Sequence, residues 1–328
     1  MGPDAAAGDR TTARTISARG RRVLWVGSTS GVEFGLARSA LAAHVDVVEL
    51  ERTTDAHDAA PAGGDVAPVF AVLASDRPGR FTVADAAALS RRWPLMPLVS
   101  VASSLVEGRR RSGPQLPGVE EVAWHDLAGR SGWWLAALDA GLPTGLGMPA
   151  TARREERLLE SIAALTRRPD WAGTDVAVAA GRPLELEGLC DLLEIAGHRV
   201  VHRSCGRPRI DETAAAVVWD VGDLLPDQLA WLRLLAANRP GLEIVLLESF
   251  PRGDTAAVAM QAGATAILGR PVSLEALAGT LVRRNAPKNT ADAGLGRQTA
   301  NTESVVSVST KNARRAGKPG KCRAAKAS

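Results

Sequence analysis

The chain has 328 residues, of which 45% are apolar and 23% charged, and this length and composition suit about two ordinary globular domains. No apolar run approaches the roughly 18 to 20 residues that span a bilayer, and the N-terminal segment lacks the apolar centre of a secretory signal. The cysteines, Cys190, Cys205 and Cys322, fit neither a disulfide framework nor a zinc pattern, so we expect a reducing, cytoplasmic setting.

The net charge of +4 is unevenly distributed along the chain. Residues 286–328 carry nine Lys or Arg and two acids, so this tail holds +7 and the rest of the chain −3. The tail has no apolar periodicity and is expected to be disordered, as are residues 1–20. Lys and Arg spaced among small residues favour weak, salt-sensitive contact with nucleic acid of any sequence. A basic tail is therefore predicted, and a basic folded surface is not.

Apolar strands alternate with helices over residues 21–141. The expected strands are 23–26, 45–50, 68–75, 96–104 and 119–124, and the expected helices are 32–43, 81–93 and 131–141. Thr82 is placed to cap the second helix, and Gly141 to end the third. Such alternation is typical of a parallel sheet covered by helices on both faces.

A connecting segment over residues 142–173 contains one predicted helix, 151–168. The apolar stripe of this helix consists of Leu158, Leu159, Ile162 and Leu165. One apolar stripe requires a packing partner. The helix fits either a strut between domains or a dimer seam. A stripe of only two turns favours the strut, because a coiled-coil seam needs three or four heptads.

The same order of elements returns over residues 174–284. The expected strands are 175–180, 199–203, 214–220, 243–247 and 266–268, and the expected helices are 184–196, 228–238, 255–262 and 274–284. We therefore expect two tandem α/β domains, 21–141 and 174–284, each a flavodoxin-like, doubly wound parallel sheet of strand order 2-1-3-4-5.

Polar residues follow several strands of the second domain. Asp220 ends VVWD, Glu248 and Ser249 end EIVLLES, and Arg270 with Pro271 follows AILG. In a doubly wound sheet these strand ends meet at one edge, where such folds bind ligands. The sequence therefore predicts a site at this edge.

The second domain resembles the receiver domain of two-component response regulators, most clearly in AVVWD and in AGATAILGRPVSLEAL. The resemblance implies that Asp220 matches the phospho-acceptor and that Arg270, with Pro271 after it, matches the family's Lys-Pro pair. It places Ala179 and Ala180 at the two acidic positions that hold Mg²⁺ in the family. Alanine side chains cannot bind a metal, so neither a metal nor another cofactor is expected.

The family's Ser or Thr at the end of the fourth strand is also changed. Glu248 takes that position, and Ser249 would supply the hydroxyl if the register shifts by one residue. Two carboxylates without Mg²⁺ should repel a phosphoryl donor, and we expect Arg270 to pair with Asp220 or Glu248 and to lock the site. The resemblance then implies a pseudo-receiver, a non-enzymatic signalling or scaffolding protein that binds a protein partner, with residues 255–284 as the expected partner surface. A response regulator that accepts phosphate on Asp220 is the first alternative.

The first domain is a more diverged receiver-like unit. Its first strand ends in the turn Gly27–Gly31 without an acidic pair, and Ser75 or Asp76 falls at the acceptor position. A Gly/Ser turn between strand and helix could hold phosphate, which leaves a nucleotide-binding α/β enzyme as a second alternative.

An Arg-rich loop precedes the last strand of the first domain. Arg109, Arg110 and Arg111 are followed by Trp124 and His125. Basic and aromatic residues together could contact an anion or nucleic acid, while a solvated loop is the simpler interpretation.

Overall fold

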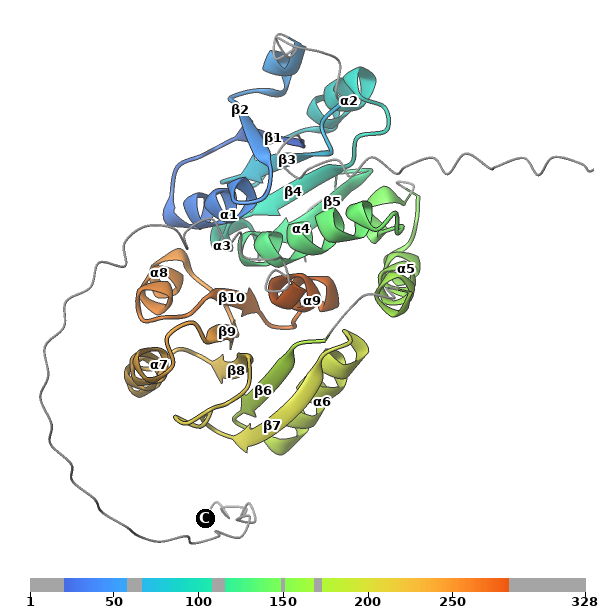
Figure 1. The fold of residues 1–328 in the computed structure, drawn as a ribbon. Coiled ribbons are helices and arrows are strands. Elements are labelled where there is room, and N and C mark those ends of the chain that lie inside the picture. Colours follow the sequence, from blue (N-terminus) through green and yellow to red (C-terminus); the bar gives the residue numbers. More distant parts are fainter. Residues whose placement is uncertain (1–20, 58–66, 108–115, 149–150, 168–172, 283–328) are drawn as a thin grey trace, which may run out of the picture. The chain divides into compact units, whose positions relative to one another are not determined.

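The structure, a computed structural model, describes residues 21–57, 67–107, 116–148, 151–167 and 173–282 (Figure 1). The predicted leader, the basic tail and Arg109–Arg111 lie outside these residues. No helix in the described ranges is long and apolar enough to cross a membrane.

The N-terminal half, residues 21–148, contains a five-stranded parallel sheet in the order β2-β1-β3-β4-β5. Its strands are β1 (Arg22–Gly27), β2 (Asp46–Leu50), β3 (Phe70–Ser75), β4 (Leu98–Ala102) and β5 (Val119–Ala123). Its helices are α1 (Val32–Ala42), α2 (Val83–Arg92), α3 (Ser104–Glu107) and α4 (Trp124–Asp139), with a short 3₁₀ helix η2 (Thr53–His57). The predicted strand order is confirmed.

The C-terminal half, residues 173–282, repeats this order, β7-β6-β8-β9-β10, in a second parallel sheet. Its strands are β6 (Asp175–Ala180), β7 (Arg199–Cys205), β8 (Ala216–Gly222), β9 (Glu243–Glu248) and β10 (Ala266–Gly269). Its helices are α6 (Pro183–Ile195), α7 (Pro226–Asn238), α8 (Gly253–Gln261) and α9 (Leu274–Val282). Along the sequence, the halves are connected by η4 (Gly145–Gly147) and α5 (Arg154–Thr166). The exact limits of the two predicted domains stay a prediction.

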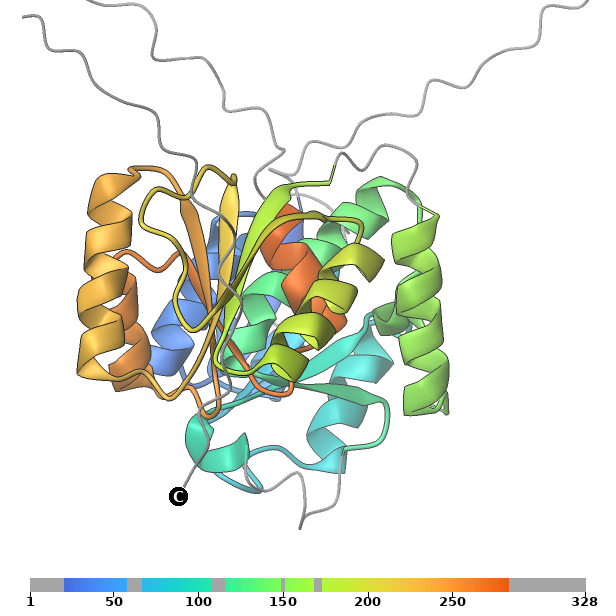
Figure 2. The same cartoon turned by 90° about the horizontal axis from the view of Figure 1, so that it is seen from below.

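Helices cover both faces of the second sheet because apolar residues occupy both faces of its strands. On β6, Val176 and Val178 pack with helices α6 and α9, whereas Ala177 and Ala179 face the core with α7 and α8. Figure 2 shows α7 and α8 in orange on one side of this sheet, with α6 and α9 on the other. The alternation follows from the two-residue period of a strand.

Local signals at the helix ends behave as predicted in the N-terminal half. Thr82 Oγ1 accepts the Asp85 N–H at 3.3 Å, and Asp85 Oδ2 accepts the Thr82 N–H at 2.8 Å, which makes a capping box. Gly141, at φ +67°, ends α4, and Leu142 N–H donates to the Ala137 carbonyl at 2.9 Å.

The beginning of α4 was predicted wrongly. The helix expected from residue 131 begins at Trp124, directly after β5. Gly129 weakens the local helical signal, because glycine is a poor helix former. In the folded protein, however, Gly129 is the place where α9 comes closest, so tertiary packing overrides its poor propensity.

Helix α5 uses only part of its predicted apolar stripe. Leu165 is 7% exposed and Ile162 packs against the core, but Leu158 and Leu159 are 52% and 66% exposed. Ser161, which is 3% exposed, faces inward instead. The helix packs on its own chain, as a strut does, and whether its exposed leucines form a dimer seam stays open.

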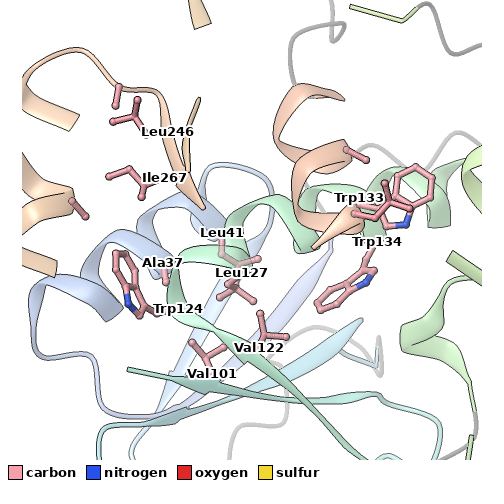
Figure 3. Packing of buried hydrophobic residues seen from close by; sticks show 14 of the residues in the cluster. Ala37, Leu41, Val101, Val122, Trp124, Leu127, Trp133, Trp134, Leu246 and Ile267 are labelled. Carbon is pink, nitrogen blue, oxygen red and sulfur yellow. The ribbon is translucent and has the colours of Figure 1, made fainter. Parts of the chain in front are cut away.

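The two halves share one apolar core across the pair α4 and α9 (Figure 3). Gly129 of α4 and Gly279 of α9 lie against each other, since a Cβ on either would come closer than 3.0 Å to backbone atoms of the other helix. At the other end of the contact, Glu33 of α1 accepts the Gly253 N–H at the start of α8, at 3.3 Å. At α4 and α9 the halves therefore pack with backbone against backbone.

This packing corrects the expected partner surface, residues 255–284. Helix α9 is buried on both sides, with Ala276, Leu277, Ala278 and Leu281 at 0% exposure. The N-terminal half covers α9, because α4 packs a glycine and several large apolar side chains against that helix. Among the described residues of this surface, the exposed large apolar side chains are Val258 and Met260 of α8, at 41% and 38%.

A buried polar cluster lies at this contact. Arg130 Nε and Nη2 donate to Glu275 Oε2 at 2.9 and 2.7 Å, and Nη2 also donates to Glu120 at 2.9 Å. Ser161 Oγ donates to the other oxygen of Glu275 at 2.5 Å. Burial alone would lower the pKa of Arg130, but the two carboxylates raise it above its ordinary value. The cluster joins α4, α5, β5 and α9.

His198 should make stability depend on pH. It is 4% exposed, its Nδ1 accepts the Thr174 N–H at 3.3 Å, and burial lowers the pKa of His198 to about 4. Because the folded pKa lies below the unfolded value near 6.5, this contribution is complete above pH 6.5 and is lost as the pH falls towards 4. Relative to His198→Gln, the free energy of unfolding should fall by about 3 kcal/mol over that window. Urea unfolding at several pH values measures it, and parallel profiles for the two proteins would contradict it.

Candidate functional site

The candidate site lies at the carboxyl ends of β8, β9 and β10 in the C-terminal half. Asp220 near the end of β8 is 8% exposed. Its Oδ1 accepts the Gly222 N–H at 3.1 Å and lies 3.4 Å from Arg270 Nη1. Burial raises the pKa of Asp220, while Arg270 and the Gly222 amide act in the opposite direction. Asp220 is thus a largely enclosed carboxyl group beside a guanidinium.

Arg270 makes its shorter contact with a residue that the sequence analysis missed. Its Nη2 donates to Glu185 Oε1 at 2.8 Å. Glu185 lies in the first turn of α6, just after the end of β6, and the bond from Arg270 lowers the pKa of Glu185. The signal was available, because the first turn after a strand reaches the same edge as the strand end. The guanidinium therefore bridges Glu185 and Asp220.

Glu248 is the last residue of β9 and is 6% exposed. Its side chain accepts a long hydrogen bond from Thr255 Oγ1 at 3.4 Å, and its backbone carbonyl accepts the Arg270 N–H at 3.0 Å. Burial raises the pKa of Glu248. Of the two partners expected for the Arg270 side chain, the structure shows an ion pair with Asp220.

Ser249 and Pro271 are both exposed beside these residues. The Ser249 N–H donates to the Gly222 carbonyl at 2.6 Å, next to an irregularity in the register between β8 and β9. Gly222 takes φ +65°, which favours glycine, and a Cβ there would lie 3.9 Å from both Ser249 Oγ and Arg270 Nη1. The Ser249 hydroxyl thus lies at the rim of the site, on the side of Gly222.

The residues at this edge do not fit the Mg²⁺ that the fold family implies. Ala179 and Ala180 are fully buried at the end of β6 and offer no side-chain oxygen. The charge next to Asp220 is the Arg270 guanidinium, which already bridges two carboxylates as a cation would. Among the described residues, no group of three or more His, Cys, Asp or Glu side chains could hold a metal. We therefore derive no step through a metal.

The corresponding edge of the N-terminal half contains the turn Gly27–Gly31. There, Ser28 Oγ lies 2.9 Å from Ser30 Oγ and accepts the Ser30 N–H at 3.3 Å. Ser75, the last residue of β3, is 9% exposed. Phosphate binding at this turn stays a prediction.

Trp124 and His125 are not part of an exposed anion or nucleic-acid site. They are 4% and 6% exposed, because they begin α4 at the contact between the halves. The His125 Nδ1 accepts the Gly269 N–H at the end of β10, at 3.1 Å. The expectation for these two residues is corrected, and that for Arg109–Arg111 lies outside the described residues.

Two doubly wound sheets of this strand order, with polar residues at the carboxyl edge of the second, define a flavodoxin-like α/β protein. No protein-family model and no curated protein matches the chain. Solved structures do match. A pilus assembly-related protein of Burkholderia pseudomallei is 26% identical, over 34% of this chain and 87% of that one, with a TM-score of 0.31.

A pilus assembly protein of Burkholderia thailandensis is likewise 26% identical, over 34% of this chain and 96% of that one, with a TM-score of 0.31. A response regulator of Thermotoga maritima is 18% identical, over 34% and 96% of the two chains, with a TM-score of 0.30.

Proposed function

We propose that this chain is a receiver-like signalling or scaffolding protein, without enzymatic activity, that acts through protein contacts and independently of phosphorylation at Asp220. The observation that carries the proposal is the Arg270 bridge between Asp220 and Glu185, at 3.4 and 2.8 Å. It ties the Asp220 carboxylate, which a phospho-acceptor would need free, into an ion pair that also engages Glu185.

Phosphoryl transfer to a carboxylate supports the same proposal by what it requires. The nucleophile must be ionised and open to the donor, and cations must neutralise the charge that develops. Asp220 is 8% exposed, and burial raises its pKa, which disfavours the charged form. Glu248, buried at the end of β9, puts an acid where the family has a neutral hydroxyl. The enclosure of Asp220 and its raised pKa both work against phosphoryl transfer.

Exposure to acetyl phosphate and Mg²⁺ tests the proposal. We expect intact-mass analysis to show no stable phosphoryl adduct under conditions that label a phospho-accepting receiver treated in parallel. Asp220→Asn serves as the matched control. An adduct that forms on the unmodified protein and is missing from Asp220→Asn would show that the site accepts phosphate.

The protein-contact part of the proposal is tested by affinity capture from the native cell after nuclease treatment. The same partner should be captured by the full chain, by Asp220→Asn and by a chain that lacks residues 286–328. Capture that disappears with nuclease or with the tail would favour the nucleic-acid alternative instead.

A further inference from the structure

His125 of the N-terminal half accepts a hydrogen bond from an edge strand of the sheet in the C-terminal half. Strand β10 is an edge strand, paired only with β9. The N–H of Arg270 points to β9, where it donates to Glu248, so the N–H of Gly269 points outward. An outward N–H on a buried edge needs a partner, and His125 Nδ1 supplies it at 3.1 Å. Asp126 Oδ1 lies 3.0 Å from the same nitrogen but accepts no hydrogen bond from it while that nitrogen accepts the Gly269 N–H.

The contact leaves no room for a side chain at position 269 unless the His125 ring moves. A Cβ there would come closer than 3.0 Å to two atoms of the His125 ring. Gly269 has no positive φ that would require glycine. The glycine is therefore explained by the ring from the other half and not by the local conformation of β10.

The segment after Gly269 carries the candidate site and is held again at its far end. Arg270, the next residue, bridges Glu185 and Asp220. Five residues further on, the Glu275 carboxylate accepts two hydrogen bonds from the Arg130 guanidinium. His125 and Arg130 both lie on α4, so one helix of the N-terminal half holds residues 269–275 at both ends.

We propose that His125 is a positioning residue for the site of the C-terminal half, and that the Arg270 bridge and the packing of the two halves form one coupled unit. The coupling does not depend on whether Asp220 accepts phosphate. Loosening the contact with His125 frees the backbone that aims the Arg270 guanidinium. Because coupling between two sites is reciprocal, disturbing the bridge must in turn loosen the start of α4.

Hydrogen exchange measured on the full chain tests the coupling in both directions. His125→Ala should speed exchange of residues 266–273 about tenfold, the effect of losing one ordinary hydrogen bond. His125→Asn, whose side-chain oxygen can accept the same N–H, should restore most of the protection. Arg270→Ala should speed exchange of residues 124–130, which lie in the other half. Residues 175–180 serve as the internal reference for global opening.

Arg209→Ala is the matched control, because it removes an exposed arginine that is paired with Asp211 in the same half. It should leave residues 124–130 unchanged. The proposal is overturned if Arg270→Ala alters only the C-terminal half, or if Arg209→Ala has an equal effect on α4. It is also overturned if His125→Ala leaves residues 266–273 as protected as before. Should His125→Ala fail to fold, His125→Asn and Arg270→Ala still decide the question.

Discussion

Replacing Arg130 by alanine should lower the free energy of unfolding by about 3 to 5 kcal/mol, the usual effect of breaking a buried ion pair from one side. The Arg130 side chain is 16% exposed and that of Glu275 only 7%. The substitution removes the cation that offsets the burial of the Glu275 carboxylate. The same cation is also lost from Glu120. Urea unfolding followed by tryptophan fluorescence measures the change, since Trp134 lies 5.0 Å from the Arg130 guanidinium.

Two further variants show whether the unpaired carboxylate causes the loss. Arg130→Met with Glu275→Gln removes both charges and should regain a large part of the stability. Arg199→Ala breaks an exposed pair with Asp175, whose side chains are 72% and 38% exposed, and should change stability by less than about 1 kcal/mol. Equal losses for Arg130→Ala and Arg199→Ala would show that the buried cluster does not hold the halves together.

Replacing Gly279 by valine should force α4 and α9 apart. A Cβ at this position would come closer than 3.0 Å to the Gly129 carbonyl oxygen and the Trp133 nitrogen, which are backbone atoms that cannot rotate away. Overpacking usually destabilises by about 1 to 3 kcal/mol when side chains can adjust. Here backbone meets backbone, so we expect a loss at the top of that range or above it.

Thermal unfolding measures this loss, and Gly188→Val provides the matched control. Gly188 also lies inside a helix, α6, but nothing is within 4 Å of a Cβ there. Valine at position 188 should be neutral or stabilising by a few tenths of a kcal/mol, since it is the better helix former. If both valine variants unfold at the temperature of the unmodified protein, the close contact between the helices does not contribute to stability.

Much of the candidate site was predictable from strand ends alone. Asp220, Glu248 and Arg270 each follow an apolar run, and parallel strands bring their carboxyl ends to one edge. The main partner of Arg270 was missed, because Glu185 is in the first turn of a helix and not at a strand end. The burial of His125 was missed for a different reason, because the group that covers it lies 144 residues further along the chain.

The sequence by itself determined the two α/β units, because the period of apolar residues and the turn residues between them are local signals. Only the tertiary structure decided which face of each unit is covered, where α4 begins and which acid Arg270 prefers. Those outcomes depend on how surfaces far apart in the chain fit together. Gly129 lowers the local helix propensity, for example, but in the folded protein it lets Gly279 pack closely against it. Local periodicity says that a face must be buried, but close packing between distant elements decides what buries it.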